Sequence, residues 1–158
     1  MSQESPLTGI ILSVVDERGP HPRMWYPKSF GNIAQIHNAA VKSFAIMIGD
    51  RSYRDKSPSD LTCFGILPYQ DMDSIGFIYF SGFEDPIERK PLPTQRPATI
   101  TLIFKKSYRD EVCQKSPQIN NLLDREAKTL WEFLQKGETN SKLLSELYNK
   151  LIAFLEIK

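Results

Sequence analysis

The side chains that most often carry catalysis or bind metals are few in this chain, and they are far apart in its sequence. The two histidines are His21 and His37, and the two cysteines, Cys63 and Cys113, are fifty residues apart. Metal sites built from cysteine and histidine need closely spaced pairs such as CxxC. Because the chain has no such pair, we predict no metal site and two free thiols in a reducing compartment.

Cys63 and His37 are the combination that nucleophilic catalysis could use, because an imidazole beside a thiol can activate it. Cys63, however, precedes Phe64 in a predicted strand, where a cysteine usually packs in the core. We therefore predict a packing role for Cys63. His21 is predicted to be exposed in a turn, and His37 to be half-buried on a helix.

The acidic pairs are predicted to lie in turns, where carboxylates are normally solvated. Asp71 and Asp73 form one pair, and Glu84 and Asp85 form the other. A hydrolytic pair needs one acid in an apolar pocket, which the surrounding sequence does not indicate. The phosphate-binding motifs GxxxxGK[ST] and GxGxxG do not occur either. We therefore predict no catalytic residue, no cofactor and no enzymatic activity.

Basic and aromatic residues are the candidates for binding a partner. Arg23, Trp25 and Tyr26 lie in a short predicted strand, and side chains alternate between its two faces, so that one ring can serve as an anchor for a partner. Arg89 and Lys90 lie in a long charged connection between strands. Packing of the two rings in the core and a solvated surface for the basic residues are the simpler alternatives. As the candidate functional residues, we predict that these five bind a protein partner. A peripheral contact with anionic lipid headgroups is the alternative for the basic pair.

The composition indicates one globular domain, which we predict to span residues 1–158 with a flexible segment at 1–7. Hydrophobic residues make up 41% of the chain and charged residues 25%, as in typical soluble proteins. The net charge of +1 argues against nucleic acid as the main ligand. The apolar run from Gly9 is too short for a signal peptide or a membrane span, and Ser2 does not permit N-myristoylation. We therefore predict a cytoplasmic protein.

Apolar runs bounded by turn residues predict five strands. The first and the fourth are apolar on both faces, so we expect them to lie side by side in the centre of a sheet. The second is bounded by prolines, which suits an edge strand. The last three follow one another closely and are predicted to form an antiparallel meander. The predicted strands are Thr8–Asp16, Pro22–Tyr26, Leu61–Pro68, Ser74–Ser81 and Ala98–Phe104.

Apolar residues at helical spacing predict a helix after the second strand and further helices after the fifth. Ser29 is the predicted N-cap of the first helix, which is expected to run to Ile48 and to stop at Gly49. Its buried stripe is predicted to include Ile33 and Val41. The later helices are predicted at Tyr108–Gln114, from Ser116-Pro117 to Gly137, and at Ser141–Leu155.

The element order is therefore β-β-α-β-β-β-α-α, which predicts an α/β (α+β) domain with helices on both faces of one sheet. This order resembles that of the longin domain. The segments that carry the resemblance are Gly9–Val15, the turn and short strand from Gly19-Pro20 to Pro27, and Gly76–Phe80. The chain also resembles the longin-like domains of GTPase regulators of the nitrogen-permease-regulator and folliculin kind, and stand-alone archaeal longin domains.

The resemblance implies a longin-like three-layer α/β/α fold, with a five-stranded antiparallel sheet between one helix and two. It also implies a scaffold that binds a small GTPase, a sister longin domain or a roadblock domain in GTPase regulation or vesicle trafficking. A homodimer and a heterodimer are both compatible with that role. No coiled-coil segment follows in the sequence, so we do not expect a tethered vesicle-fusion role.

Three hypotheses of function follow, and the first is preferred. It is a non-catalytic longin-like adaptor, which binds its partner through the exposed face of the first helix or through the edge strand with Arg23, Trp25 and Tyr26. The second is a sensor of the PAS or profilin-like type, which requires an apolar cavity between sheet and helix with polar groups around it. The third is a small acyl or thiol hydrolase centred on Cys63.

Overall fold

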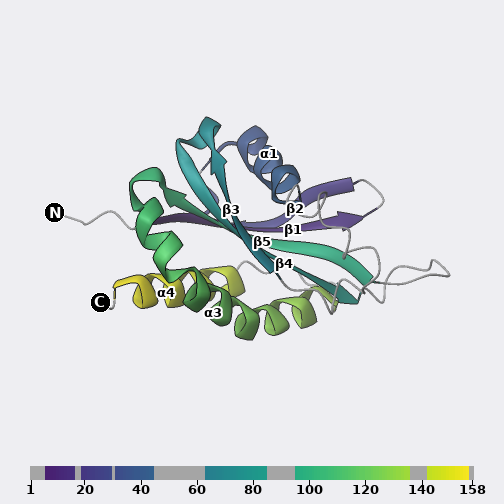
Figure 1. The fold of residues 1–158 in the computed structure, drawn as a ribbon. Helices are drawn as coiled ribbons and strands as arrows, with labels where there is room; N and C mark the ends of the chain where they lie inside the picture. Colours follow the sequence, from purple (N-terminus) through teal and green to yellow (C-terminus); the bar gives the residue numbers. More distant parts are fainter. Residues whose placement is uncertain are drawn as a thin grey trace.

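The elements of the chain follow the predicted order (Figure 1). The computed structural model describes residues 6–16, 19–29, 31–44, 63–84, 95–135 and 142–156. The strands are β1 (Leu7–Asp16), β2 (Gly19–Tyr26), β3 (Cys63–Tyr69), β4 (Ser74–Glu84) and β5 (Gln95–Lys105). The helices are α1 (Ile33–Ser43), α3 (Arg109–Gln135) and α4 (Lys142–Glu156), with short 3-10 turns η3 (Gln70–Met72) and η4 (Lys106–Tyr108).

The five strands form one antiparallel sheet in the order β2-β1-β5-β4-β3. The prediction that β2 is an edge strand and that β3, β4 and β5 form a meander is confirmed. The two strands predicted to lie side by side do not, because β5 lies between β1 and β4. Both are nevertheless interior strands, and this satisfies the requirement that two apolar faces be covered.

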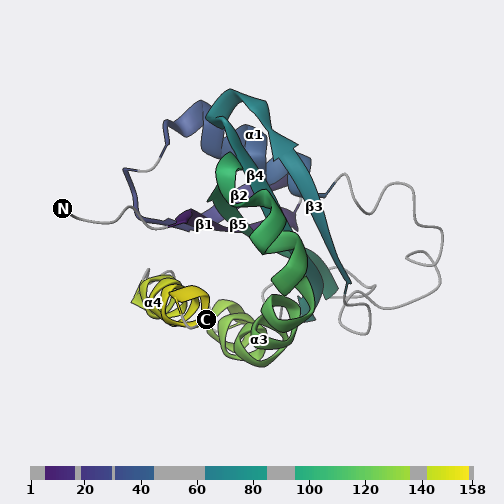
Figure 2. The same ribbon diagram turned by 60° about the vertical axis from the view of Figure 1, so that its left-hand side comes forward.

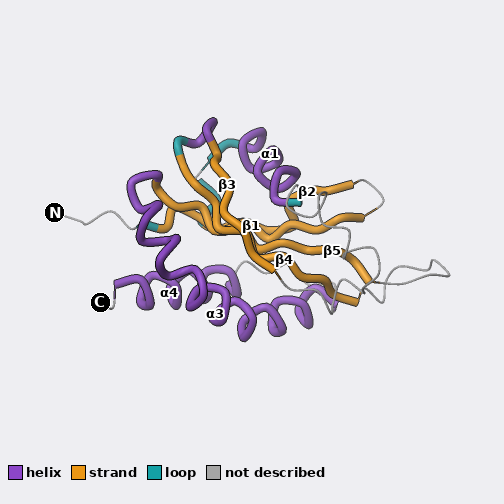
Figure 3. The backbone as a smooth tube through the Cα atoms, viewed as in Figure 1, coloured by secondary structure: helices purple, strands orange, loops and turns teal. Residues whose placement is uncertain are grey.

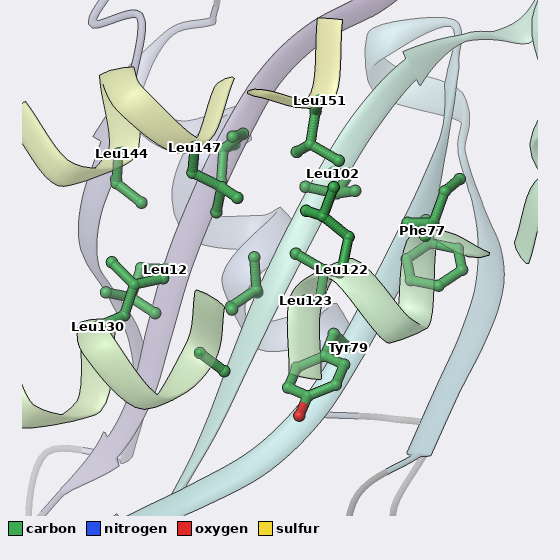
Figure 4. Close-up of a cluster of buried hydrophobic side chains, with 14 of the residues drawn as sticks. Leu12, Phe77, Tyr79, Leu102, Leu122, Leu123, Leu130, Leu144, Leu147 and Leu151 are labelled. Carbon is green, nitrogen blue, oxygen red and sulfur yellow. The ribbon is translucent and has the colours of Figure 1, made fainter. Parts of the chain in front are cut away.

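The sheet is covered by α1 on one face and by α3 and α4 on the other, as Figure 3 shows. The predicted three-layer arrangement is therefore confirmed. On the two-helix face, 22 of the described residues form a continuous apolar cluster, and Figure 4 shows Leu12 and Leu102 of the sheet beneath leucines of both helices. Two hydrogen bonds tie these helices to the sheet, from the Tyr79 hydroxyl to Asp124 at 2.5 Å and from the Tyr148 hydroxyl to the Leu7 carbonyl at 2.9 Å.

Several strand boundaries differ from the predicted ones. Strand β1 begins at Leu7, which is buried. Leu7 therefore does not belong to the flexible segment that was predicted at 1–7. Strands β4 and β5 pair as far as Glu84 and Gln95, so both strands extend into the long charged connection that was predicted between them. The pairing of backbone groups along the hairpin outweighs the low strand propensity of its proline and charged residues.

Helix α1 begins later than predicted. Asn32 is its N-cap, and a reciprocal capping box links it to Gln35: the Gln35 amide donates to Asn32 Oδ1 at 2.8 Å, and the Asn32 amide donates to Gln35 Oε1 at 3.1 Å. Asparagine is as good an N-cap as serine, and only Asn32 has this partner three residues later. Ser29 lies in the turn before the helix. The predicted end at Ile48 and Gly49 lies outside the described residues.

Helix α3 is continuous where a break was predicted. It runs through Pro117, which removes one backbone donor from the helix. Cys113, whose carbonyl loses this partner, is exposed to water, and the Ser116 hydroxyl bonds to the Val112 carbonyl at 2.8 Å. Burial of Ile119 and Leu123 against the sheet holds the helix together across the proline. Figure 2 shows α3 changing direction along its length as it crosses the sheet.

Candidate docking surfaces and a cavity

Helix α1 is held to the sheet at both ends by contacts with the β3–η3 segment. Near its start, Gln35 Nε2 donates to the Asp71 carbonyl at 2.9 Å. Near its end, Lys42 donates to the Pro68 carbonyl, and its ammonium lies 4.9 Å from the centre of the Tyr69 ring. These contacts define which face of α1 is buried and which face points to solvent.

The buried face of α1 is small. It consists of Ile36, Ala39, Ala40 and Ser43, and Phe44 follows at the end of the helix. The Ser43 hydroxyl bonds to Thr99 Oγ1 of β5 at 2.6 Å and to the Ala40 carbonyl at the same distance. The predicted buried stripe of Ile33 and Val41 is therefore wrong, because the helix is rotated so that its alanines approach the sheet.

The outer face of α1 carries an apolar stripe instead. Ile33 is 69% exposed and Val41 is 44% exposed. His37 lies between them at helical spacing and is also exposed, which corrects the prediction that it is half-buried. Residues at i, i+4 and i+8 lie on one face of a helix. We call Ile33, His37 and Val41 the α1 stripe.

The two edges of the sheet differ in their capacity to pair with another strand. Edge strand β2 contains Pro20 and Pro22, which lack backbone N–H donors. Its pairing with β1 also shifts register: Leu12 pairs with Met24 and Ser13 with Pro22, so Arg23 is the extra residue of a bulge. Prolines and bulges both hinder the addition of a strand. Edge strand β3 has its one proline, Pro68, near its end.

Residues Arg23, Trp25 and Tyr26, which were predicted to bind a partner, are all half-buried. Trp25 packs beside the cluster under α1, and the Lys28 ammonium lies 4.2 Å from its ring centre. Tyr26 faces the opposite side, where its ring meets that of Tyr148 edge-on at 5.3 Å. The two rings thus point to opposite faces, as the alternation of a strand requires. Their role in binding stays a prediction.

Phe64 on β3 is another large hydrophobic residue that is exposed, at 40%. Its ring stacks on that of Phe77 with centroids 5.2 Å apart. Phe64 and Ile66 lie on the face that α3 and α4 cover, but at the outer edge of that cover. No described strand pairs with the outer edge of β3, and the aromatic ring of Phe64 on this strand is open to solvent.

The remaining residues that were considered as candidate sites are partly outside the described part of the chain. Arg89 and Lys90 lie outside the described residues, as does the side chain of Cys63. His21 is half-buried and not exposed, and its Nδ1 lies 3.0 Å from the Gly19 carbonyl.

In the described ranges, no three histidine, cysteine or acidic side chains gather into a metal-binding group. No helix in those ranges is both long and apolar enough to cross a bilayer.

A cavity of about 420 Å³ opens at one end of the sheet, between the β3–β4 hairpin and the start of α3. Aliphatic side chains of both strands form part of its wall, and Lys106 and Arg109 lie on the side of the helix. Its lining residues are Ile66, Leu67, Pro68, Gln70, Asp73, Ser74, Ile75, Lys106 and Arg109.

Sequence reasoning missed both the α1 stripe and the cavity. Helix α1 has apolar residues on more than one side, so its hydrophobic pattern did not identify the buried one. A useful signal was present, however: Ala39 and Ala40 are adjacent small residues, which permit close packing of a helix. The cavity is formed by three separate segments, and no local pattern links them.

The comparisons with known proteins concern the fold. No protein-family model matches the sequence, and no curated protein matches it. Among solved structures, the longin domain of Lst4 from K. lactis is similar, with a TM-score of 0.60 over 95% of this chain and 97% of that domain. The sequence identity is 16%. The chain therefore has a longin fold, and the fold predicted from its sequence is confirmed.

Proposed function

We propose that this chain is a non-catalytic adaptor of the longin type, which binds a protein partner through the α1 stripe and the neighbouring β3 edge. The observation that carries the proposal is the exposure of Ile33 and Val41, two large aliphatic side chains eight residues apart on one helix face. Exposed apolar groups that share a face favour association with another protein.

The anchoring of α1 supports a role in docking. Both ends of the helix are fixed to the β3–η3 segment through Gln35 and Lys42, so the stripe is presented on a rigid support. A partner that binds a rigid surface loses little conformational entropy on the adaptor's side. The proposed mechanism needs no cofactor, because it depends on surface complementarity alone.

The β3 edge is the second part of the proposed surface. The Lys42 contact with Pro68 places the end of α1 next to β3, so one partner can reach both. An unpaired strand edge offers backbone hydrogen bonds to a strand of another chain. We propose that the partner is a small GTPase or a second longin or roadblock domain, and that Arg23, Trp25 and Tyr26 form a separate, secondary contact.

Three variants test this proposal by affinity capture from a native lysate, with mass-spectrometric identification of the retained proteins. In the first, Ile33→Asp and Val41→Asp place charges on the stripe; in the second, Phe64→Lys places one at the β3 edge. In the control, Asn38→Asp adds a charge to an exposed position of α1 outside the stripe. Circular dichroism checks that each variant is folded.

We expect the unchanged protein and the Asn38→Asp variant to retain a GTPase, longin or roadblock protein. The stripe variant is expected to lose it, and Phe64→Lys to retain less of it. If the retained proteins belong to none of these classes, or if the stripe variant retains them fully, the proposed adaptor surface is wrong.

A further inference from the structure

We propose that the cavity beside β3 binds a small amphiphile with one aliphatic chain and a carboxylate head group, of the medium-chain fatty acid class. The site shares strand β3 with the proposed docking surface, but it lies between the β3–β4 hairpin and the start of α3, and its test does not depend on that surface. This assignment is supported by the apolar wall of the cavity, by two cations that line it and by the balance of charge around them.

The wall of the cavity is suited to an aliphatic chain. Ile66 of β3 and Ile75 of β4 supply branched apolar side chains on the face toward α3, and Pro68 extends this surface. Leu67 also lines the cavity, but its side chain packs on the opposite face, against the cluster under α1. Its volume of about 420 Å³ lies within the range of sites that hold small molecules. Burying an alkyl chain against such a wall removes apolar surface from water, which favours binding.

Lys106 and Arg109 provide the cationic end of the cavity. They lie three residues apart where η4 leads into α3, so both project from one turn of backbone. Within the described chain, neither side chain forms an ion pair or a hydrogen bond. Lys150, by contrast, pairs with Glu126 at 3.0 Å. The two cations are therefore available to a ligand.

The charges that line the cavity favour a head group with a single negative charge. Lys106 and Arg109 carry two positive charges, and Asp73 carries one negative charge. Asp73 lies at the end of η3 with a positive φ of 49°, and it would repel a second negative charge on the ligand. A carboxylate also matches the fork of the Arg109 guanidinium, which can donate two parallel hydrogen bonds to it.

Polar groups near Asp73 can complete the contact with the head group. The exposed Gln70 side chain lines the cavity, and its amide can donate to a carboxylate oxygen. The Ser74 hydroxyl already donates to the Met72 carbonyl at 2.8 Å, so we assign it no ligand bond. The resulting site has an aliphatic wall and three donor side chains, which is the pattern that recognises a fatty acid rather than a neutral lipid.

Four ten-carbon probes test the inference by isothermal titration calorimetry, each below its micelle concentration: decanoate, decyl phosphate, decanol and decyltrimethylammonium. We expect saturable binding of decanoate, and weaker binding of the other three. Backbone amide shifts in NMR spectra should map decanoate to the β3–η3–β4 segment and the η4–α3 junction. Shifts confined to the α1 stripe would place the ligand elsewhere and overturn the assignment.

Variants at the mouth of the cavity identify the head-group contact. Removing both cations with Lys106→Gln and Arg109→Gln should weaken decanoate binding by on the order of tenfold or more. The matched control is Arg125→Gln with Lys128→Gln, which removes two exposed cations of α3 outside the cavity and should leave binding unchanged. Asp73→Asn should strengthen the binding of decanoate, and that of decyl phosphate by a larger factor.

Three results would overturn the proposal. Equal affinity for decanol and decanoate would show that the cations do not recognise the head group. Preference for decyl phosphate in the unchanged protein would show that the site takes a dianion instead. Equal losses in the cavity variant and in the control pair would show that the attraction is a general effect of charge.

Discussion

The two faces of the sheet are built differently. The face beneath α3 and α4 carries a cluster of 22 described residues, with leucine, isoleucine and aromatic side chains from the sheet and both helices. The face beneath α1 carries a cluster of seven described residues, two of which are alanines. Hydroxyl groups interrupt this second face, since Ser13, Thr99 and Thr101 are buried there beside the apolar side chains.

The two faces of the sheet therefore contribute differently to the stability of the fold and to the proposed docking surface. The burial of apolar area is the main source of folding free energy, so the two-helix face should supply most of the stability. The α1 face needs only a small, close contact, and α1 therefore keeps large apolar side chains on its outer side. The thinner layer is the one that can offer a surface to a partner.

The largest expected difference between the faces comes from neighbouring residues of β1. Leu12 faces α3 and α4 and Ile11 faces α1, and both are fully buried. Leu12→Ala should lower the free energy of unfolding by about 2–5 kcal/mol. Ile11→Ala should fall near the lower end of that range, because a single helix on a small cluster can settle into the space. Urea denaturation followed by circular dichroism measures both, and an equal or larger loss for Ile11→Ala would contradict the comparison.

A smaller effect is expected from two serines on the α1 face. Ser43 bonds to Thr99 and to the Ala40 carbonyl, so Ser43→Ala leaves buried groups unpaired and should cost about 1–3 kcal/mol. The Ser13 hydroxyl is equally buried and has no hydrogen-bond partner among the described residues. Ser13→Ala breaks no such bond and should leave the free energy of unfolding unchanged or raise it slightly. The same urea experiment compares them, and similar losses for both would show that Ser13 has a bonded partner.

The smallest effect concerns pH and Tyr69, which joins β3 to α1. Its ring lies over Gly76, where an added Cβ would be 2.2 Å from a ring atom, and its hydroxyl is 3.4 Å from the Ala39 carbonyl. Burial raises the pKa of the Tyr69 phenol well above its ordinary value of 10.0. Above pH 10, the unfolded chain therefore releases this proton while the folded chain keeps it, so stability falls as the pH rises.

The variant Tyr69→Phe removes that contribution. Unfolding in urea, measured at several values between about pH 8 and pH 11, should show the variant losing less stability than the unchanged protein above pH 10. The slope of the unfolding free energy against pH measures how strongly burial on the α1 face disfavours ionisation of Tyr69. A difference between the two proteins that does not change with pH would show that the phenol ionises as freely in the folded chain as in the unfolded one.

Much of the fold could be predicted from local patterns. In β5, for example, Thr99 and Thr101 lie on one face and Ile100 and Leu102 on the other, because side chains of a strand alternate regardless of its neighbours. Helix α4 was predicted to within a residue of each end. Pro117 misled the same reasoning, since local propensity favours a break that packing against the sheet overrides.

The candidate sites could be predicted only in part. The exposed face of the first helix was proposed as a docking surface, but Ile33 and Val41 were assigned to its buried side. Residues 33–41 contain enough apolar positions to define two stripes, and the choice between them depends on the shape of the sheet below. The lining of the cavity comes from β3, β4 and the start of α3. The start of α3 is brought beside β4 because β4 pairs with β5, and η4 and α3 follow β5 in the chain.

Local sequence patterns were sufficient to predict the five strands, the order of the main elements and the alternation of side chains along a strand. These properties depend on residues near one another along the chain, where backbone geometry sets the periods of alternation. The packing of the folded chain places β5 between β1 and β4, turns the alanines of α1 inward, and brings Lys106 and Arg109 to an aliphatic cavity. Those outcomes depend on contacts between segments that are far apart in the sequence. Local patterns are compatible with several such arrangements, and the packing of the whole chain selects one of them.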